Sequence, residues 1–114
     1  MTFDEYQKQA ILTDSFDGKT VDIDSHAFIS KLLGLVGESG EVAEKFKKIF
    51  RDKGGKITSA DIEEISKELG DVLWYTSAMA CYLGLSLEDI ANNNLTKVHS
   101  RKSRGQTKGS GDNR

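Results

Sequence analysis

Four acidic residues stand in two pairs with the same spacing, Glu38 with Glu41 and Glu68 with Asp71. Residues three apart lie on one face of a helix, so each pair sets two carboxylates side by side if its segment is helical. Carboxylate oxygens are ligands for hard divalent cations, and Mg²⁺ needs only a few of them beside water and phosphate oxygens, with Mn²⁺ as a substitute. If the two helices pack antiparallel, the four acids predict a site for one or two such ions.

The lysines around these acids offer a second interpretation. Unpaired carboxylates about 4 Å apart repel each other by about 4 kcal/mol at an effective dielectric constant of about 20, which an exposed ion pair does not offset. Solvated acids that pair with neighbouring lysines would avoid this repulsion without a metal. Four lysines lie near enough in the sequence to do so: Lys45, Lys47, Lys48 and Lys67. The spacing alone leaves both interpretations open.

Glycines are concentrated around the acids, at Gly34, Gly37, Gly40 and Gly70. A glycine inside a helix costs about 1 kcal/mol relative to alanine, so a group of them indicates a local reason. Close approach of two helices is one reason, and space for a ligand is another. A break of the helix between Gly34 and Gly40 is the structural alternative.

The elements that carry these residues are predicted to be helices. The chain has no proline, and apolar residues recur at intervals of three and four, which predicts an all-α fold. Ser25 and either Thr58 or Ser59 are expected N-caps, while Gly54 and Gly84 end helices. The predicted helices span about 2–13, 26–53, 59–83 and 87–102, with a polar loop over 14–24. Residues 1–102 are expected to form one domain, and the polar basic tail, 103–114, to be disordered.

The composition excludes several classes of protein. The 114 residues carry sixteen basic and eighteen acidic side chains, but residues 98–114 hold five basic and one acidic, so the body is acidic. This balance disfavours nucleic-acid binding and suits a cation site. Cys81, with only His26 and His99 beside it, cannot build a disulfide framework or a thiolate zinc site. Without a signal-like or membrane-spanning apolar run, a cytoplasmic location and no membrane association are expected.

The two acidic pairs, in this order along the sequence, resemble the motifs of a known family. With the 26-residue spacer between them, they are similar to the Glu-x-x-Glu and Glu-x-x-Asp motifs of the MazG-like all-α nucleoside triphosphate pyrophosphohydrolases, which include the dimeric dUTPases. A polar series on the last predicted helix is similar to the C-terminal signature of the family. This series consists of Asn94, Lys97 and Arg101. The resemblance extends over about residues 3–105.

The resemblance implies an activity and a role for each motif. It implies Mg²⁺-dependent hydrolysis of a (deoxy)nucleoside triphosphate to a nucleoside monophosphate and pyrophosphate, as in nucleotide-pool cleaning. The metal ligands would be Glu38, Glu41, Glu68 and Asp71, and the triphosphate would contact Asn94, Lys97 and Arg101. Glu38 or Glu41 is the expected catalytic base, with neighbouring Glu44 as an alternative. A four-helix bundle completed as a homodimer or homotetramer is also implied.

Recognition of the base and the class of protein are less constrained. Tyr75 follows Asp71 by one helical turn, so its ring is expected to stack on a nucleobase, with Trp74, or Phe3 and Tyr6, walling the pocket. Aromatic residues at helical spacing also serve as core residues, so a structural role of these side chains stays open.

Two other functions remain as alternatives. One is a non-enzymatic helical interaction module with a basic tail, and the other is hydrolysis of another phosphorylated substrate.

Overall fold

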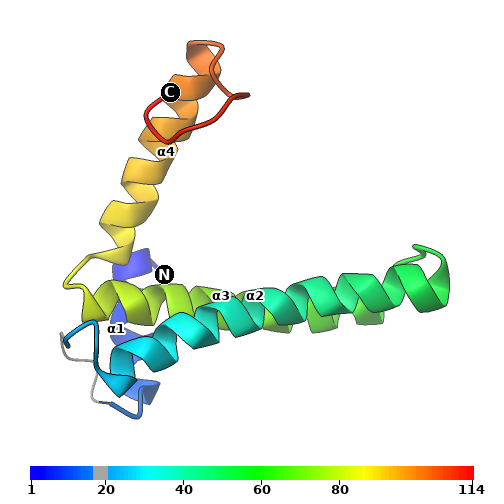
Figure 1. The fold of residues 1–114 in the computed structure, drawn as a ribbon, viewed down its shortest axis with the longest axis horizontal. Coiled ribbons are helices and arrows are strands. Elements are labelled where there is room, and N and C mark those ends of the chain that lie inside the picture. The colour runs from blue at the N-terminus through cyan, green and yellow to red at the C-terminus, as the bar shows by residue number, and fades with distance from the viewer. Residues whose placement is uncertain (17–20) are drawn as a thin grey trace.

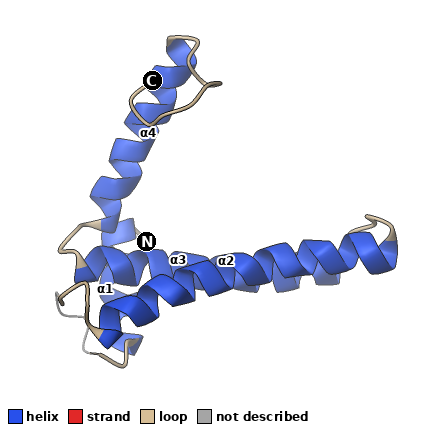
Figure 2. Cartoon of the chain, in the orientation of Figure 1, coloured by secondary structure: helices blue, strands red, loops and turns tan. Residues whose placement is uncertain are grey.

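Helices and their connections make up the described part of the chain. The computed structural model describes residues 1–16 and 21–114, and residues 17–20 of the predicted loop lie outside the described residues. No strand occurs in these two ranges (Figure 2). The elements are α1 (Phe3–Ala10), the 3₁₀ turn η1 (Ile11–Thr13), α2 (His26–Lys53), α3 (Ser59–Tyr82) and α4 (Leu87–Ser103). The all-α prediction is confirmed.

Local side-chain chemistry sets the helix ends where the sequence predicts them. The hydroxyl of Ser25 accepts a hydrogen bond from the N–H of Phe28 and caps α2. Gly54 ends that helix in the left-handed region, at φ 58°, where a side chain would be strained. At the start of α3, Thr58 and Asp61 exchange hydrogen bonds in a capping box. These caps satisfy amides and carbonyls that have no partner within a helix.

The two longest helices, α2 and α3, run antiparallel as a hairpin (Figure 1). Ile49 and Ile65 are buried toward one end of their contact. Toward the other end, Ala78 and Tyr82 are buried where α1 packs across α3. The hairpin is therefore the rigid element that fixes the acidic pairs relative to each other.

The last helix, α4, leaves the hairpin rather than packing along it (Figure 1). It contacts α1 and the end of α3 but makes no contact with α2. The side chain of Gln7 holds this junction, because it donates to the carbonyl of Leu85 and accepts from the N–H of Leu87, both at 2.9 Å. The direction of α4 is thus set by α1 and by the turn after α3.

The chain is open and leaves apolar surface uncovered. Its radius of gyration is 16.9 Å, whereas a compact domain of this length would have about 13 Å. Leu33, Val36 and Phe50 on α2 and Leu69 on α3 are each more than half exposed. In the described ranges, no helix has both the length and the apolar content that crossing a bilayer requires. Completion of the bundle by further copies stays a prediction.

Candidate metal centre

Three of the four predicted metal ligands come together in the hairpin. Glu38 of α2 and Glu68 and Asp71 of α3 each offer a carboxylate oxygen, and these three atoms lie within 4.8 Å of one another. Glu38 and Glu68 are half-buried, and Asp71 is exposed. We call these residues the acid triad. Its all-oxygen chemistry and reachable face fit a hard divalent cation.

Glu41, the fourth predicted ligand, is exposed and lies outside the acid triad. Its negative charge still acts on Glu38. The pKa of Glu38 is raised, first by burial and then by the negative charges of Asp71, Glu68 and Glu41. A raised carboxyl pKa means that the surroundings destabilise the ionised form, which a bound cation would reverse. This electrostatic frustration fits a metal site better than a solvated helix face.

Most of the lysines that could neutralise the acids without a metal pair with acids outside the triad. Only the Lys45 ammonium reaches the acid triad, with its Nζ 3.4 Å from Oε1 of Glu68. The other three pair with acids outside the triad: Lys47 and Lys48 with Glu44, and Lys67 with Glu64. Within residues 1–16 and 21–114, no ion pair involves Glu38 or Asp71. Lysines therefore neutralise the triad only in part.

The glycines have two different structural roles. The helix α2 is continuous from His26 to Lys53, so the alternative of a helix break is wrong. A Cβ atom at Gly34 would clash with the ring of Tyr75, so close approach explains this glycine. At Gly37, Gly40 and Gly70, a Cβ atom would meet nothing within 4 Å. Open space, rather than a close helix contact within one chain, surrounds these three positions beside the acids.

The two aromatic residues after Asp71, Trp74 and Tyr75, also have different surroundings. Trp74 donates from Nε1 to the hydroxyl of Thr13 at 2.9 Å and to the carbonyl of Ala10 at 3.2 Å, which ties α3 to the N-terminal segment. The Tyr75 ring meets the Trp74 ring edge to face, with centroids 4.9 Å apart. Tyr75 is half-buried. Trp74 therefore has a structural contact, and Tyr75 is held one turn from the acid triad.

An apolar pocket lies between the N-terminal residues, α1 and α3. It is lined by Phe3, Tyr6 and Leu73 together with the first two residues, it is partly open to solvent, and its cavity volume is about 120 Å³. This volume is below the range of about 300–1,000 Å³ that is usual for drug-sized ligands, so the pocket could hold only a part of a nucleotide. Burial and, second, the charge of Asp71 raise the pKa of Tyr6, so this pocket lies within electrostatic reach of the triad.

A buried ion pair beside the hairpin was missed by sequence reasoning. Nζ of Lys31 lies 2.7 Å from Oδ1 of Asp14, and their side chains are 5% and 0% exposed. The hydroxyl of Tyr82 donates a hydrogen bond to the other carboxylate oxygen. Burial acts to raise the pKa of Asp14, but the contacts with Lys31 and Tyr82 outweigh it and hold this pKa below its usual value. The pair pins the segment after η1 to both long helices.

One signal in the sequence does point to this pair. Lys31 stands three residues after Phe28 and four before Leu35, within the apolar stripe of α2. A lysine in such a stripe is almost never buried without a partner. The pattern thus indicates a buried acid, although it does not say which one.

The polar residues of α4 are separate from the acid triad within one chain. Asn94, Lys97 and Arg101 lie on a helix that makes no contact with α2. Lys97 and Arg101 instead bind Asp112 of the C-terminal segment. The predicted phosphate contacts and the acid triad therefore do not form one site in the isolated chain.

Comparison with known proteins finds a phage relative and a matching family. The chain is 46% identical to the Gene 37 protein of Mycobacterium phage L5 over the full length of both proteins. No solved structure matches it significantly. The sequence profile of the MazG nucleotide pyrophosphohydrolase domain matches residues 27–105, which include the acid triad and the polar residues of α4. The chain therefore belongs to the MazG nucleotide pyrophosphohydrolase family.

Proposed function

We propose that this protein hydrolyses a (deoxy)nucleoside triphosphate to the monophosphate and pyrophosphate with Mg²⁺. The observation that carries the proposal is the convergence of Glu38, Glu68 and Asp71 inside the segment that matches the family. Three like charges with a raised Glu38 pKa favour a bound cation. Nucleotide-pool cleaning and a cytoplasmic location are the corresponding expectations.

The acid triad would hold the metal, and Glu41 would complete the set from the next turn of α2. Bound Mg²⁺ supplies charge that offsets the negative oxygens of the phosphates. Glu38 and Glu41 are the candidates to orient and deprotonate the attacking water, since Glu44 is held by Lys47 and Lys48. The open space beside Gly37 and Gly70 leaves room for the substrate.

A second copy is the proposed source of the phosphate contacts. Because α4 does not reach α2 in its own chain, its Asn94, Lys97 and Arg101 would meet the acid triad of another subunit. The exposed apolar side chains of α2 and α3 support such an assembly, as buried apolar area drives association. We propose a homodimer or a homotetramer.

The base would lie in the pocket between α1 and α3. Phe3, Tyr6 and Leu73 offer apolar and aromatic surface beside the acid triad. Tyr75 lies one turn from Asp71 and remains the proposed stacking residue, while Trp74 is engaged with the N-terminal segment. A flat, apolar wall next to a metal and phosphate site is suited to a nucleobase.

Release of pyrophosphate from a panel of nucleotides, with Mg²⁺, Mn²⁺ or EDTA, tests the proposal. The native chain is compared with Glu41→Gln and Asp71→Asn, and with Glu63→Gln as a control at an exposed acid of α3 outside the triad. We expect metal-dependent release in the native and control proteins and a loss of at least about a hundredfold in the other two. Equal, metal-independent background throughout would favour the interaction module. Activity on another phosphorylated compound alone would favour the third class.

A further inference from the structure

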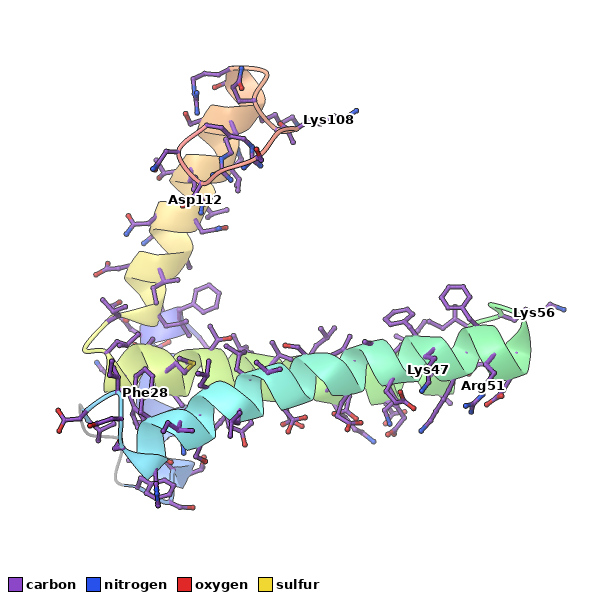
Figure 3. All side chains as sticks on the ribbon, viewed as in Figure 1. Phe28, Lys47, Arg51, Lys56, Lys108 and Asp112 are labelled. Carbon is purple, nitrogen blue, oxygen red and sulfur yellow. The ribbon has the colours of Figure 1, made fainter. Side chains whose placement is uncertain are left out.

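The C-terminal segment turns back along α4 and brings Asp112 beside this helix (Figure 3). Oδ1 of Asp112 accepts hydrogen bonds from Nζ of Lys97 at 2.9 Å and from Nη2 of Arg101 at 3.1 Å. The same Arg101 nitrogen also donates to the backbone carbonyl of Asp112. A single residue of the tail thus engages both cationic groups that would contact a phosphate.

The cations form a built anion site rather than a loose surface cluster. The Arg101 side chain is only 11% exposed, and its Nε is buried without a hydrogen-bond partner. Asn93 and Asn94 line the pocket in which Lys97 and Asp112 meet. Two cations share one oxygen of a carboxylate here, whereas a phosphate group presents three oxygens and satisfies guanidinium donors better. The site is therefore incompletely filled by Asp112.

We propose that Asp112 is an internal anionic ligand that occupies the α4 site until a phosphate group of the substrate displaces it. The tail then regulates the same polyphosphate site that the proposed function uses, and this part of the inference rests on that function. The carboxylate takes the position of one phosphate group, and its release exposes Lys97, Arg101 and Asn94 together.

The composition of the tail suits reversible release. Residues 105–114 carry no apolar side chain, and three glycines with positive φ (Gly105, Gly109 and Gly111) shape the turn. The Asp112 side chain is 75% exposed, so water competes for its carboxylate even though the Arg101 side chain is mostly buried. Such a segment binds without a hydrophobic anchor and leaves at low cost. In this proposal, the disordered tail that the sequence predicts and the tail bound at Lys97 and Arg101 are two states of one equilibrium.

Competition of this kind has a kinetic signature. A site that is free for only a fraction of the time binds its ligand more weakly by that fraction. With saturating substrate the tail is displaced, so the rate of the chemical step does not change. Removing the carboxylate is therefore expected to lower KM by about three- to tenfold and to leave kcat unchanged.

The first experiment measures both constants for Asp112→Asn in the full chain. Asp52→Asn is the matched control, because it removes the same charge from an exposed aspartate at the far end of the hairpin. The control should match the native protein in KM. An unchanged or increased KM for Asp112→Asn would overturn the proposal, as would an equal decrease in both variants, which would mean a general effect of charge.

The second experiment follows binding without catalysis. Tripolyphosphate is titrated in EDTA at fixed ionic strength while the backbone amide signals of Gly111 to Asn113 are recorded by NMR. We expect these signals to move to random-coil positions as the anion binds, and tripolyphosphate to bind Asp112→Asn more tightly than the native chain. Release of the tail without hydrolysis of any nucleotide would support the internal ligand and remove the proposed function. Anion binding that leaves the tail signals unmoved would overturn the internal ligand, whatever the activity.

Discussion

Neutralising Glu38 gives opposite predictions for the metal-free and metal-bound protein. The substitution Glu38→Gln keeps the shape of the side chain but removes its charge from the acid triad. Carboxylate oxygens of the triad lie within 4.8 Å of one another. Two charges at that distance repel by about 3.5 kcal/mol at an effective dielectric constant of about 20 and by about 0.9 kcal/mol in water.

Because Asp71 is exposed to water, the repulsion between two charges of the triad is expected to lie nearer to about 0.9 than to about 3.5 kcal/mol. Glu38 takes part in two of the three repulsive pairs, so we expect its neutralisation to stabilise the metal-free protein by about 1–2 kcal/mol. For a chain of this size, that raises Tm by roughly 3–12 °C. Most surface substitutions have much smaller effects.

In EDTA we expect Glu38→Gln to be more stable than the native protein, and with Mg²⁺ we expect the native protein to be the more stable of the two. When Mg²⁺ is present at about a hundred times its Kd, binding stabilises the native protein by about 2.7 kcal/mol. The variant lacks one of the three ligands of the triad and should gain much less. Thermal unfolding at a fixed protein concentration, with EDTA and across a Mg²⁺ series, measures both effects, and Glu63→Gln serves as the control. If Glu38→Gln follows that control in both conditions, the triad is a set of solvated acids and the metal site is refuted.

Further predictions concern the buried ion pair, the glycines and the apolar face. Asp14→Asn should destabilise the protein by about 3–5 kcal/mol in denaturant unfolding, because it leaves Lys31 buried without a counter-charge. Since the folded pKa of Asp14 is lowered, its contribution is present above the unfolded pKa of about 3.9 and is lost as pH falls through the folded value, so acid should destabilise the native chain more than Asp14→Asn. Gly34→Ala should lower the free energy of unfolding by about 1–3 kcal/mol, because the added methyl group clashes with Tyr75. Gly37→Ala should raise the free energy of unfolding by about 1 kcal/mol, because alanine favours the helix and meets nothing. The same variant should lower activity if the substrate occupies this space. Leu33→Asp should convert an oligomer to monomers in sedimentation, and a monomeric native chain would contradict the proposed assembly.

Local signals predicted the helices because their causes are local. Ser25, Thr58 and Gly54 act within one turn of their own helix, so their effect does not depend on the rest of the fold. The convergence of Glu38 with Glu68 and Asp71 also follows from short spacing, once the two helices are antiparallel neighbours. These features are legible in a single sequence.

Long-range contacts were not predictable in the same way. Asp14 stands in a polar loop, and nothing near it in the sequence identifies Lys31 as its partner. The direction of α4 depends on Gln7 and Asp4 of α1, which bond to the turn and the start of α4 about eighty residues later. Its separation from α2 is the reason that the acids and the α4 cations do not meet in one chain. Such geometry arises from contacts that spacing does not encode.

The inward face of α2 gives the strongest physical reason to expect a cation at the acid triad. Three charged residues recur on it at intervals of seven: Lys31, Glu38 and Lys45. Lys31 meets Asp14 at 2.7 Å, and Lys45 meets Glu68 at 3.4 Å, so each lysine has an opposite charge. Among the described residues, Glu38 has only negative neighbours that shift its pKa. The two flanking charges on this face are compensated and Glu38 is not, and this difference supports our proposal that a cation binds at the acid triad.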